Sequence, residues 1–370
     1  MRKIDRRTFL QDLGIATATA VLATGGSAGQ VLAAEQSAEQ LKEQPMIYEL
    51  TDAHTHYTDW FQNTEGIDSF LESLDAAKVS DAVLFGIPLR KMWTSENGLD
   101  KDSARKYDDS RRVWAAETDY IVAAAFVHAS PAQKKRLHPF ICGINGNDML
   151  ALDHVKRLIQ LYPGMWKGIG EIFSHHDLVS WTTYGEIPRP DSEAYDMVYK
   201  FAAKYNMPVN IHSNITSSAS ASSPLPLFRG QMENALGNNP GTTFIWAHVG
   251  ISNSLHVYNL PEIASELLDQ YPNLNFDLSW LVYENDVAKD GKLVPEWVGL
   301  LERYSDRFML GSDFVGHFKP VETYRKEIRK YDLLLNALKP SAAVRIAHDN
   351  FLRLLPSQGV TLKSEDKIFI

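Results

Sequence analysis

Two histidines separated by a single residue have the spacing of metal ligands. His54 and His56 follow a short apolar segment, residues 46–53. Because alternate side chains of a β-strand point to the same face, both imidazoles would face one cation from a single strand. A lone His-x-His pair is often a structural accident, so it indicates a metal site only in the company of further ligands.

Further candidate ligands stand at the ends of later apolar segments. His212 and His248 each end one, Glu171 follows Gly-Ile-Gly, and Asp313 follows Met-Leu-Gly-Ser. A carboxylate at the end of an apolar strand is costly to bury unless it is paired or bound to a metal. If these segments are strands of one barrel, their carboxyl ends meet at one rim, where barrel active sites lie.

Short apolar segments alternate with amphipathic ones through most of the sequence. The predicted strands are residues 46–53, 81–88, 139–144, 166–172, 208–212, 243–248, 274–278 and 308–313. The predicted helices between and after them are residues 67–78, 150–161, 192–205, 260–270, 295–304 and 342–355. This alternation predicts an α/β protein, a single (β/α)8 TIM barrel with parallel strands, although an open doubly wound sheet would alternate in the same way.

The interval after the second predicted strand is longer than the others. Residues 90–138 hold Trp93, a charged stretch at 101–112 and a helix-like segment at 114–126. Long loops that follow barrel strands are often functional, so we interpret this insertion as a lid over the mouth of the barrel.

The composition excludes several classes of function. The chain has 370 residues, 44% of them hydrophobic, and a formal net charge of −9, so a large core is expected and a nucleic-acid partner is not. Cys142 is the only cysteine, which excludes an intrachain disulfide and a cysteine-based zinc cage. A metal site would need histidine and carboxylate ligands.

The first residues resemble a twin-arginine export signal. Arg6 and Arg7 precede a weakly apolar segment at 13–32, and small residues at 31–33 suit a signal peptidase. We therefore expect a signal peptide at residues 1–34, a barrel domain at 35–370, and a periplasmic or secreted product of the twin-arginine export machinery. No stable membrane anchor is expected after cleavage, and the sequence leaves homo-oligomer formation open.

With these motifs in place, the chain resembles the amidohydrolase superfamily, and within it the amidohydrolase-2 branch that includes aminocarboxymuconate-semialdehyde decarboxylase. The resemblance runs from the His-x-His strand through Gly-Ser-Asp to Asp-Asn-Phe-Leu-Arg-Leu-Leu at 349–355. It implies that His54, His56, His212 and Asp313 bind a divalent metal, with His248 either a catalytic group or a ligand of a second ion. Glu171 is either a metal ligand or a carboxylate that orients an imidazole.

The leading hypothesis is a hydrolase in which metal-activated water attacks an amide, ester or lactone carbonyl of a small molecule. One or two zinc ions suit such ligands, and manganese or iron would also fit. Asp313 would act as the base and His248 would stabilise the oxyanion. A non-oxidative decarboxylase is the alternative, favoured if a basic residue such as Arg90 or Lys91 lies near the metal. A non-catalytic periplasmic ligand-binding barrel is a third hypothesis, and a TatD-like nuclease a fourth.

Other residues have weaker claims to the site. His175 and His176 follow the fourth strand, where they would either line the pocket or form a polar loop pair, and His317 after the eighth strand is comparable. Asp52 has the strand parity of the two histidines and is expected to support them. Four tryptophans are predicted near the rim, where they either pack the lid or stack on a ring substrate: Trp60, Trp93, Trp181 and Trp280.

Overall fold

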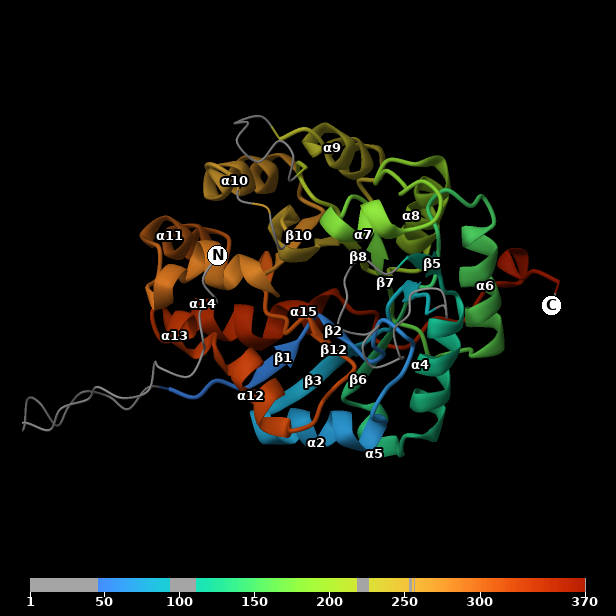
Figure 1. The fold of residues 1–370 in the computed structure, drawn as a ribbon, viewed down its shortest axis with the longest axis horizontal. Coiled ribbons are helices and arrows are strands. Elements are labelled where there is room, and N and C mark those ends of the chain that lie inside the picture. Colours follow the sequence, from blue (N-terminus) through green and yellow to red (C-terminus); the bar gives the residue numbers. More distant parts are fainter. Residues whose placement is uncertain (1–45, 94–110, 218–225, 253–254, 256, 370) are drawn as a thin grey trace, which may run out of the picture. The chain divides into compact units, whose positions relative to one another are not determined.

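Eight parallel strands form one curved sheet in the computed structural model, which describes residues 46–93, 111–217, 226–252, 255 and 257–369 (Figure 1). They run in the order β1-β3-β6-β7-β8-β9-β10-β11, which is their order in the sequence. Their bounds are β1 Leu50–Asp52, β3 Val79–Leu84, β6 Leu137–Ile141, β7 Gly168–Phe173, β8 Val209–His212, β9 Phe244–Trp246, β10 Leu274–Asp277 and β11 Phe308–Met309.

The first and last strands close the sheet into a barrel. The backbone N–H of Ala53 donates to the carbonyl of Leu310 at 2.9 Å, and that of Asp313 donates to the carbonyl of His54 at 2.7 Å. Beyond these bonds β2 (Thr55–His56) pairs in parallel with β12 (Phe314–Val315). The predicted barrel is therefore confirmed, and the doubly wound alternative was wrong. At the rim, a short break separates β1 from β2 and β11 from β12.

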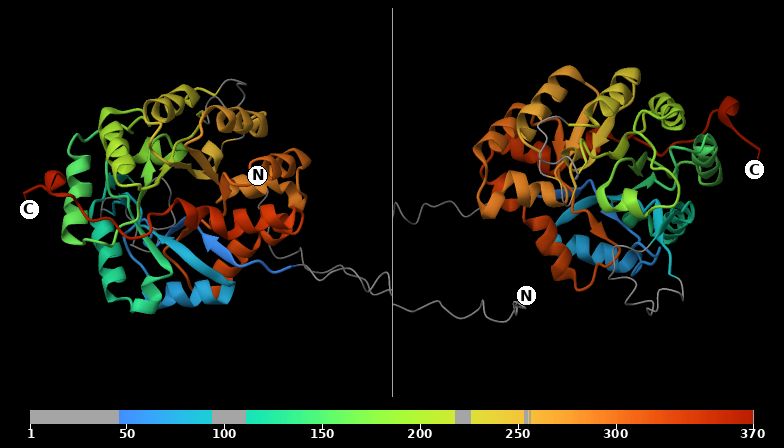
Figure 2. Two further views of the ribbon diagram at one scale, coloured as in Figure 1. Left: turned by 180° about the vertical axis from the view of Figure 1, so that it is seen from behind. Right: turned by 45° about the horizontal axis from the view of Figure 1, so that its top comes forward.

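Helices surround the strands in all three views (Figures 1 and 2). The longer ones are α2 Ile67–Ala77, α4 Glu117–His128, α6 Ala151–Leu161, α8 Glu193–Lys204, α9 Arg229–Asn238, α10 Leu260–Gln270, α11 Pro295–Arg303 and α12 Val321–Arg329. The shorter ones are α5 Pro131–Lys134, α7 Asp177–Thr182, α13 Asp332–Leu335, α14 Pro340–Val344 and α15 Asn350–Leu354. The predicted terminal helix is thus α14 and α15, joined by the π-helical turn Arg345–Asp349.

Two apolar layers follow from strand alternation. Residues such as Ala82, Leu84 and Ile141 face the helices and belong to the main core, whereas Val83 and Phe140 belong to a separate cluster that the opposite faces of the strands form inside the barrel. The free thiol of Cys142 is buried in this inner cluster. Among the described residues, no helix is both long and apolar enough to cross a bilayer.

The insertion after the second strand is only partly what the sequence predicted. Its described part begins with an antiparallel hairpin of β4 (Leu89–Lys91) and β5 (Arg112–Trp114). The helix that follows, α4, is a barrel helix rather than a lid, because Val122 and Ala123 are fully buried in the main core. The predicted lid was therefore wrong for this helix, which the sequence analysis assigned to the insertion. Residues 94–110, and the predicted signal peptide, lie outside the described residues.

Candidate metal centre

Four imidazoles surround one carboxylate at the carboxyl end of the barrel. The Oε2 atom of Glu171 lies 3.5 Å from His54 Nε2 and 3.4 Å from His56 Nε2. Its Oε1 atom lies 3.1 Å from His212 Nδ1 and 3.6 Å from His248 Nε2. Each carboxylate oxygen thus faces one pair of histidines, so strands that are far apart in the sequence converge on Glu171.

Asp313 completes this cluster from the last strand. Its Oδ1 atom lies 3.1 Å from His56 Nε2 and 3.4 Å from His54 Nε2. Burial opposes the charged form of Asp313, but its hydrogen bond with His56 and the nearby charge of His54 outweigh burial and lower its pKa. Asp313 is therefore ionised at neutral pH, the state that a general base or a metal ligand requires.

The backbone turns Glu171 inward at an irregularity of β7. The pairing of β7 with β8 shifts by one residue between Ile169 and Ile172, as in a β-bulge. Gly170 has φ +128°, and a Cβ there would lie 2.3 Å from the carbonyl oxygen of Asn210. Only glycine allows β7 to approach β8 this closely, so the Gly-Glu pair is a packing requirement of the site.

Three residues at the rim have left-handed backbone conformations. His248 has φ +55°, Trp280 φ +58° and Asp313 φ +49°. Each such conformation of a non-glycine residue costs on the order of 1 kcal/mol and persists only where the surrounding structure enforces it. All three residues line the pocket, so at these positions the strained conformation helps to place a pocket side chain.

The ring nitrogens that point away from Glu171 are held by hydrogen-bond acceptors. His54 Nδ1 lies 3.0 Å from Asp277 Oδ2, and His56 Nδ1 donates to the carbonyl of Gly86 at 2.7 Å. His248 Nδ1 contacts the carbonyl and hydroxyl oxygens of Ser279 at 3.1 and 2.8 Å. Protons on these outer nitrogens leave bare Nε2 lone pairs turned toward the centre, which is how proteins prepare imidazole ligands.

The sequence analysis missed Asp277. It ends the seventh strand, and its carboxylate accepts hydrogen bonds from the backbone N–H groups of His248 and Ser279 in addition to facing His54. Burial opposes the charged form, but the charge and hydrogen bond of His54 outweigh it and lower the pKa of Asp277. The rule that selected Asp313, a carboxylate at the end of an apolar strand, would also have selected Asp277.

His212 uses the opposite nitrogen, and a chain of hydrogen bonds explains why. Its Nε2 atom lies 3.2 Å from Asn214 Oδ1. The Asn214 amide cannot flip without loss, because its Nδ2 donates to Asp177 Oδ1 at 3.1 Å, while Ser252 Oγ donates to Asp177 Oδ2 at 2.5 Å. The amide oxygen must therefore accept from His212 Nε2–H, which leaves Nδ1 bare toward Glu171.

Replacement of Asn214 by leucine tests this chain. We expect Asn214→Leu to weaken zinc binding about 10- to 100-fold, because the tautomer of His212 is no longer fixed. Competition with a chromogenic chelator measures the affinity. Asn214→Asp restores an acceptor and should recover most of the loss, and Ser252→Ala is the matched control that keeps the bond between Asn214 and His212. Unchanged affinity in Asn214→Leu would contradict the assignment.

Asp52 supports the cluster from beneath, as the sequence predicted. Its carboxylate accepts hydrogen bonds from the backbone N–H and hydroxyl of Ser312, from the Tyr324 hydroxyl and from the backbone N–H of His54. Burial raises the pKa of Asp52 to about 6, although these hydrogen bonds act in the opposite direction. Asp52 thereby ties the first strand to the residue that precedes Asp313.

The donor set fits a divalent cation. The Nε2 atom of His54 is buried and has no hydrogen-bond partner in the described part of the chain. Burial opposes protonation of His54 and His56, but the nearby carboxylates outweigh it, raising the pKa of His54 well above its usual value and that of His56 to about 9. The cluster thus requires positive charge, which protons or a metal ion could supply. Among the residues that the structure describes, three groups have ligand atoms within 4.8 Å of one another: His54, His56 and Glu171; His54, His248 and Asp277; and Glu171, His212 and His248.

A pocket of about 370 Å³ opens onto this cluster. Its polar lining includes His56, Glu171, His212, His248 and Asp313, so the predicted site residues except the deeper His54 face the cavity. The remaining lining residues are Trp60, Arg112, Phe173, His176, Asp177, Val179, Trp280 and Val315. A cavity of this size suits a small molecule.

The less certain histidines divide into pocket and structural residues. His176 lines the pocket and stacks on His212, with ring centroids 4.1 Å apart, so its interpretation as half of a polar loop pair was wrong. Burial, followed by the neighbouring His212, lowers the pKa of His176 well below its usual value. His175 instead stacks on Phe228, and the exposed His317 pairs with Asp59.

Two of the four tryptophans predicted near the rim line the pocket, and the other two are exposed to solvent. Trp60 and Trp280 line the pocket, which favours the stacking interpretation over lid packing. Trp93 and Trp181 are exposed. Arg112, another pocket residue, had no signal in the sequence beyond its place in a charged stretch, because its position depends on the β4–β5 hairpin.

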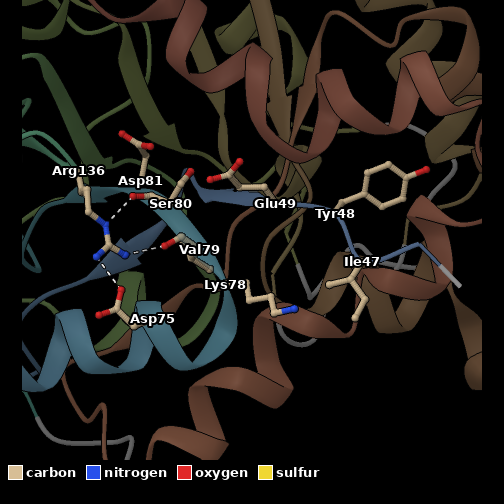
Figure 3. Close-up of a pocket in the computed structure, with 9 residues that line it drawn as sticks. All are labelled: Ile47, Tyr48, Glu49, Asp75, Lys78, Val79, Ser80, Asp81 and Arg136. Carbon is tan, nitrogen blue, oxygen red and sulfur yellow. Dashed lines mark hydrogen bonds and ion pairs between the residues drawn. The ribbon is translucent and has the colours of Figure 1, made fainter.

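A larger cavity of about 610 Å³ lies at the other end of the barrel, beside the amino ends of β1 and β3 (Figure 3). Its main cation, Arg136, is already bonded to Asp75 at 2.6 Å and to the carbonyls of Val79 and Ser80, both at 2.8 Å. These bonds hold a helix to a strand, so this cavity has a structural explanation, and the candidate functional site lies at the end of the barrel that holds Glu171.

Comparisons with known proteins agree with this geometry. Residues 181–356 match the model of the amidohydrolase family Amidohydro_2. This range includes His212, His248 and Asp313 but not His54, His56 or Glu171, which the fold alone adds to the cluster. No curated protein matched the sequence.

Solved structures resemble this chain at low sequence identity, and the first of those below is similar in fold. A zinc-bound amidohydrolase from Burkholderia multivorans is 12% identical, with a TM-score of 0.50 over 84% of this chain and 100% of that one. The 4-oxalomesaconate hydratase from Rhodopseudomonas palustris is 15% identical, with a TM-score of 0.47 over 83% of this chain and 95% of that one. The dihydroorotase from Campylobacter jejuni is 13% identical, with a TM-score of 0.46 over 84% and 86%.

Proposed function

We propose that this protein is a metal-dependent hydrolase of the amidohydrolase superfamily that adds water to the carbonyl carbon of a small amide, ester or lactone. The observation that carries the proposal is the convergence of His54, His56, His212 and His248 on Glu171, beside the ionised Asp313, at the pocket end of a barrel. The match of residues 181–356 to an amidohydrolase family supports the same class.

The histidines, with Glu171 and Asp313, would hold one or two divalent ions, and zinc fits the mixture of imidazole and carboxylate ligands. When bound, such an ion polarises a carbonyl group and lowers the pKa of water at the site. The two oxygens of Glu171 face separate histidine pairs, so this carboxylate would help to hold one ion or two.

The protein groups would supply the proton transfers. Asp313, which lines the pocket, would accept a proton from water as the water oxygen bonds to the carbonyl carbon. It would return that proton to the leaving nitrogen or oxygen as the C–N or C–O bond breaks. His248 would either bind the ion through its Nε2 lone pair or, when protonated on both ring nitrogens, donate from Nε2 to the developing oxyanion.

A carboxy-lyase is the second candidate, and one observation favours it. A decarboxylase needs a basic group to place the substrate carboxylate. Of the candidates from the sequence, Arg90 is exposed and pairs with Glu117. Arg112, however, lies in the pocket wall. A substrate carboxylate held there would serve either reaction, so the products must decide between the two.

A substrate panel with metal removal tests the proposal. We expect the zinc-loaded protein to release acid from some members of an ester, lactone and amide panel without releasing CO2. Dialysis against a chelator should abolish turnover, and added zinc or manganese should restore it. Release of CO2 from a carboxylate panel would instead identify a carboxy-lyase. A protein that binds zinc but converts no member of either panel would be a ligand-binding barrel.

We also propose that the protein is exported in the folded state through the twin-arginine machinery. The support is the Arg6–Arg7 pair, followed by an apolar, small-residue segment. The expected result is a shortened product in the periplasm or medium, and replacement of both arginines by lysine should retain the full-length chain in the cytoplasm. Normal export of that variant would contradict the proposal.

A further inference from the structure

Arg112 and His176 line the pocket but take no part in the proton transfers of the proposed reaction. We propose that they bind a carboxylate group of the substrate, whose planar or apolar body packs against Trp60 and Trp280. This inference rests on the proposed function only in taking the pocket as the substrate site, and it applies to a hydrolase and to a carboxy-lyase alike.

Arg112 is a buried, rigidly held cation. It is 2% exposed, and in the part of the pocket wall that the structure describes it is the one residue with a permanent positive charge. Its Nη1 donates to Thr182 Oγ1, and its guanidinium lies 5.0 Å from the ring centroid of Trp60. Its carbonyl accepts from the N–H of Tyr184, which fixes the strand beside α7.

The chemistry of this cation suits a carboxylate. The guanidinium is planar and carries five N–H donors in a fixed fork, which can form two parallel hydrogen bonds to a carboxylate. The carboxylates of Glu171 and Asp313 lie in the metal cluster, and Asp177 accepts from Asn214 and Ser252.

His176 adds hydrogen-bonding capacity beside this cation. Its ring is nearly parallel to that of His212, with 12° between the two planes. The Nδ1 atom is buried and has no hydrogen-bond partner among the described residues. A neutral imidazole carries one donor and one acceptor, so His176 can contribute an N–H to an oxyanion without adding charge.

The rest of the wall is apolar and suits the body of such a substrate. Trp60 lies against Phe173, with ring centroids 6.2 Å apart, and Trp280 lies 5.3 Å from His248. Val179 and Val315 complete this surface. Aromatic walls favour flat, weakly hydrated groups, so a ring or conjugated chain with one carboxylate matches the pocket better than a neutral polar molecule.

Binding of benzoate and benzamide to the zinc-loaded full chain tests the inference, because the two probes have nearly the same shape and differ in charge. We expect calorimetry to show that the wild type binds benzoate at least about tenfold more tightly than benzamide. Arg112→Gln should lose this preference, and His176→Leu should weaken benzoate binding alone. Arg90→Gln, which removes an exposed guanidinium from the partner strand of the same hairpin, should bind both probes like the wild type.

Two results would overturn the inference: no preference for benzoate in the wild type, or an undiminished preference in Arg112→Gln, which would mean that benzoate binds to the zinc ion. If Arg112→Gln does not fold, Arg112→Lys tests the inference instead, since lysine keeps the positive charge but cannot form two parallel hydrogen bonds to a carboxylate. It should bind benzoate several-fold more weakly and benzamide unchanged. These measurements need no turnover, so failure of the proposed hydrolase in the substrate panel is a separate result.

Discussion

Glu171→Gln should reduce turnover by about 10³-fold or more and lower the zinc content of the purified protein. The substitution keeps the shape of the side chain but removes the charge that faces His54, His56, His212 and His248. Loss of a correctly held ion removes several kcal/mol of transition-state stabilisation, and each 1.4 kcal/mol corresponds to a factor of ten. Metal content by mass spectrometry and steady-state rates on an accepted substrate measure the two effects.

The sequence left open whether Glu171 binds the metal or orients the imidazoles, and the two roles predict different zinc contents for Glu171→Gln. If it binds zinc directly, the zinc content of Glu171→Gln should fall by one ion per chain or to zero. If it only orients imidazoles, zinc affinity should fall about 10- to 100-fold, with full occupancy restored at high zinc. Glu117→Gln, an exposed acid paired with Arg90, is the control and should match the wild type. A fully active Glu171→Gln would refute both roles.

Asp313→Asn should lower kcat by about 10² to 10⁴-fold in protein that still contains metal, because asparagine cannot accept the proton from water. The effect should depend on the leaving group. A nitrophenyl ester needs no proton on its departing oxygen and should lose less rate than an amide, whose nitrogen must be protonated. Comparison of the two substrates separates proton transfer from damage to the metal site.

The exposed Asp306, which precedes the eighth strand, supplies the control for this experiment. Asp306→Asn should leave both rates unchanged. Equal losses for ester and amide in Asp313→Asn, together with a lower zinc content, would assign Asp313 to ligation alone. Full activity of Asp313→Asn with metal bound would show that another group is the base.

The barrel was predictable because its strands are short apolar segments at regular intervals. The convergence of the candidate ligands was predictable for a related reason: polar residues at the ends of such segments have no reason to be buried unless they meet one another. His54, His56, Glu171, His212 and Asp313 follow that rule, and all of them meet in the structure. Asp277 follows it too and was overlooked.

Other features depend on contacts that no local pattern encodes. The place of Arg112 is set by the pairing of β5 with β4 and by the bond between its carbonyl and the N–H of Tyr184. His212 turns Nδ1, rather than Nε2, toward Glu171. This choice depends on Asn214 and Asp177, which lie in different parts of the sequence. The helix α4 resembled part of a lid in the sequence because its sides differ little in polarity, and only its packing against the core shows its role.

The seam of the barrel, where the first and last strands meet, has a consequence for how the protein is made. His54 and His56 leave the ribosome early, but the strand that closes against them, and Asp313 with it, comes about 260 residues later, as the bond from the Asp313 N–H to the His54 carbonyl shows. A nascent chain that lacks the last strand would carry most of the ligands without a closed ring to hold them. Metal loading is therefore expected to follow completion of the chain, which makes a bound ion a marker of finished synthesis.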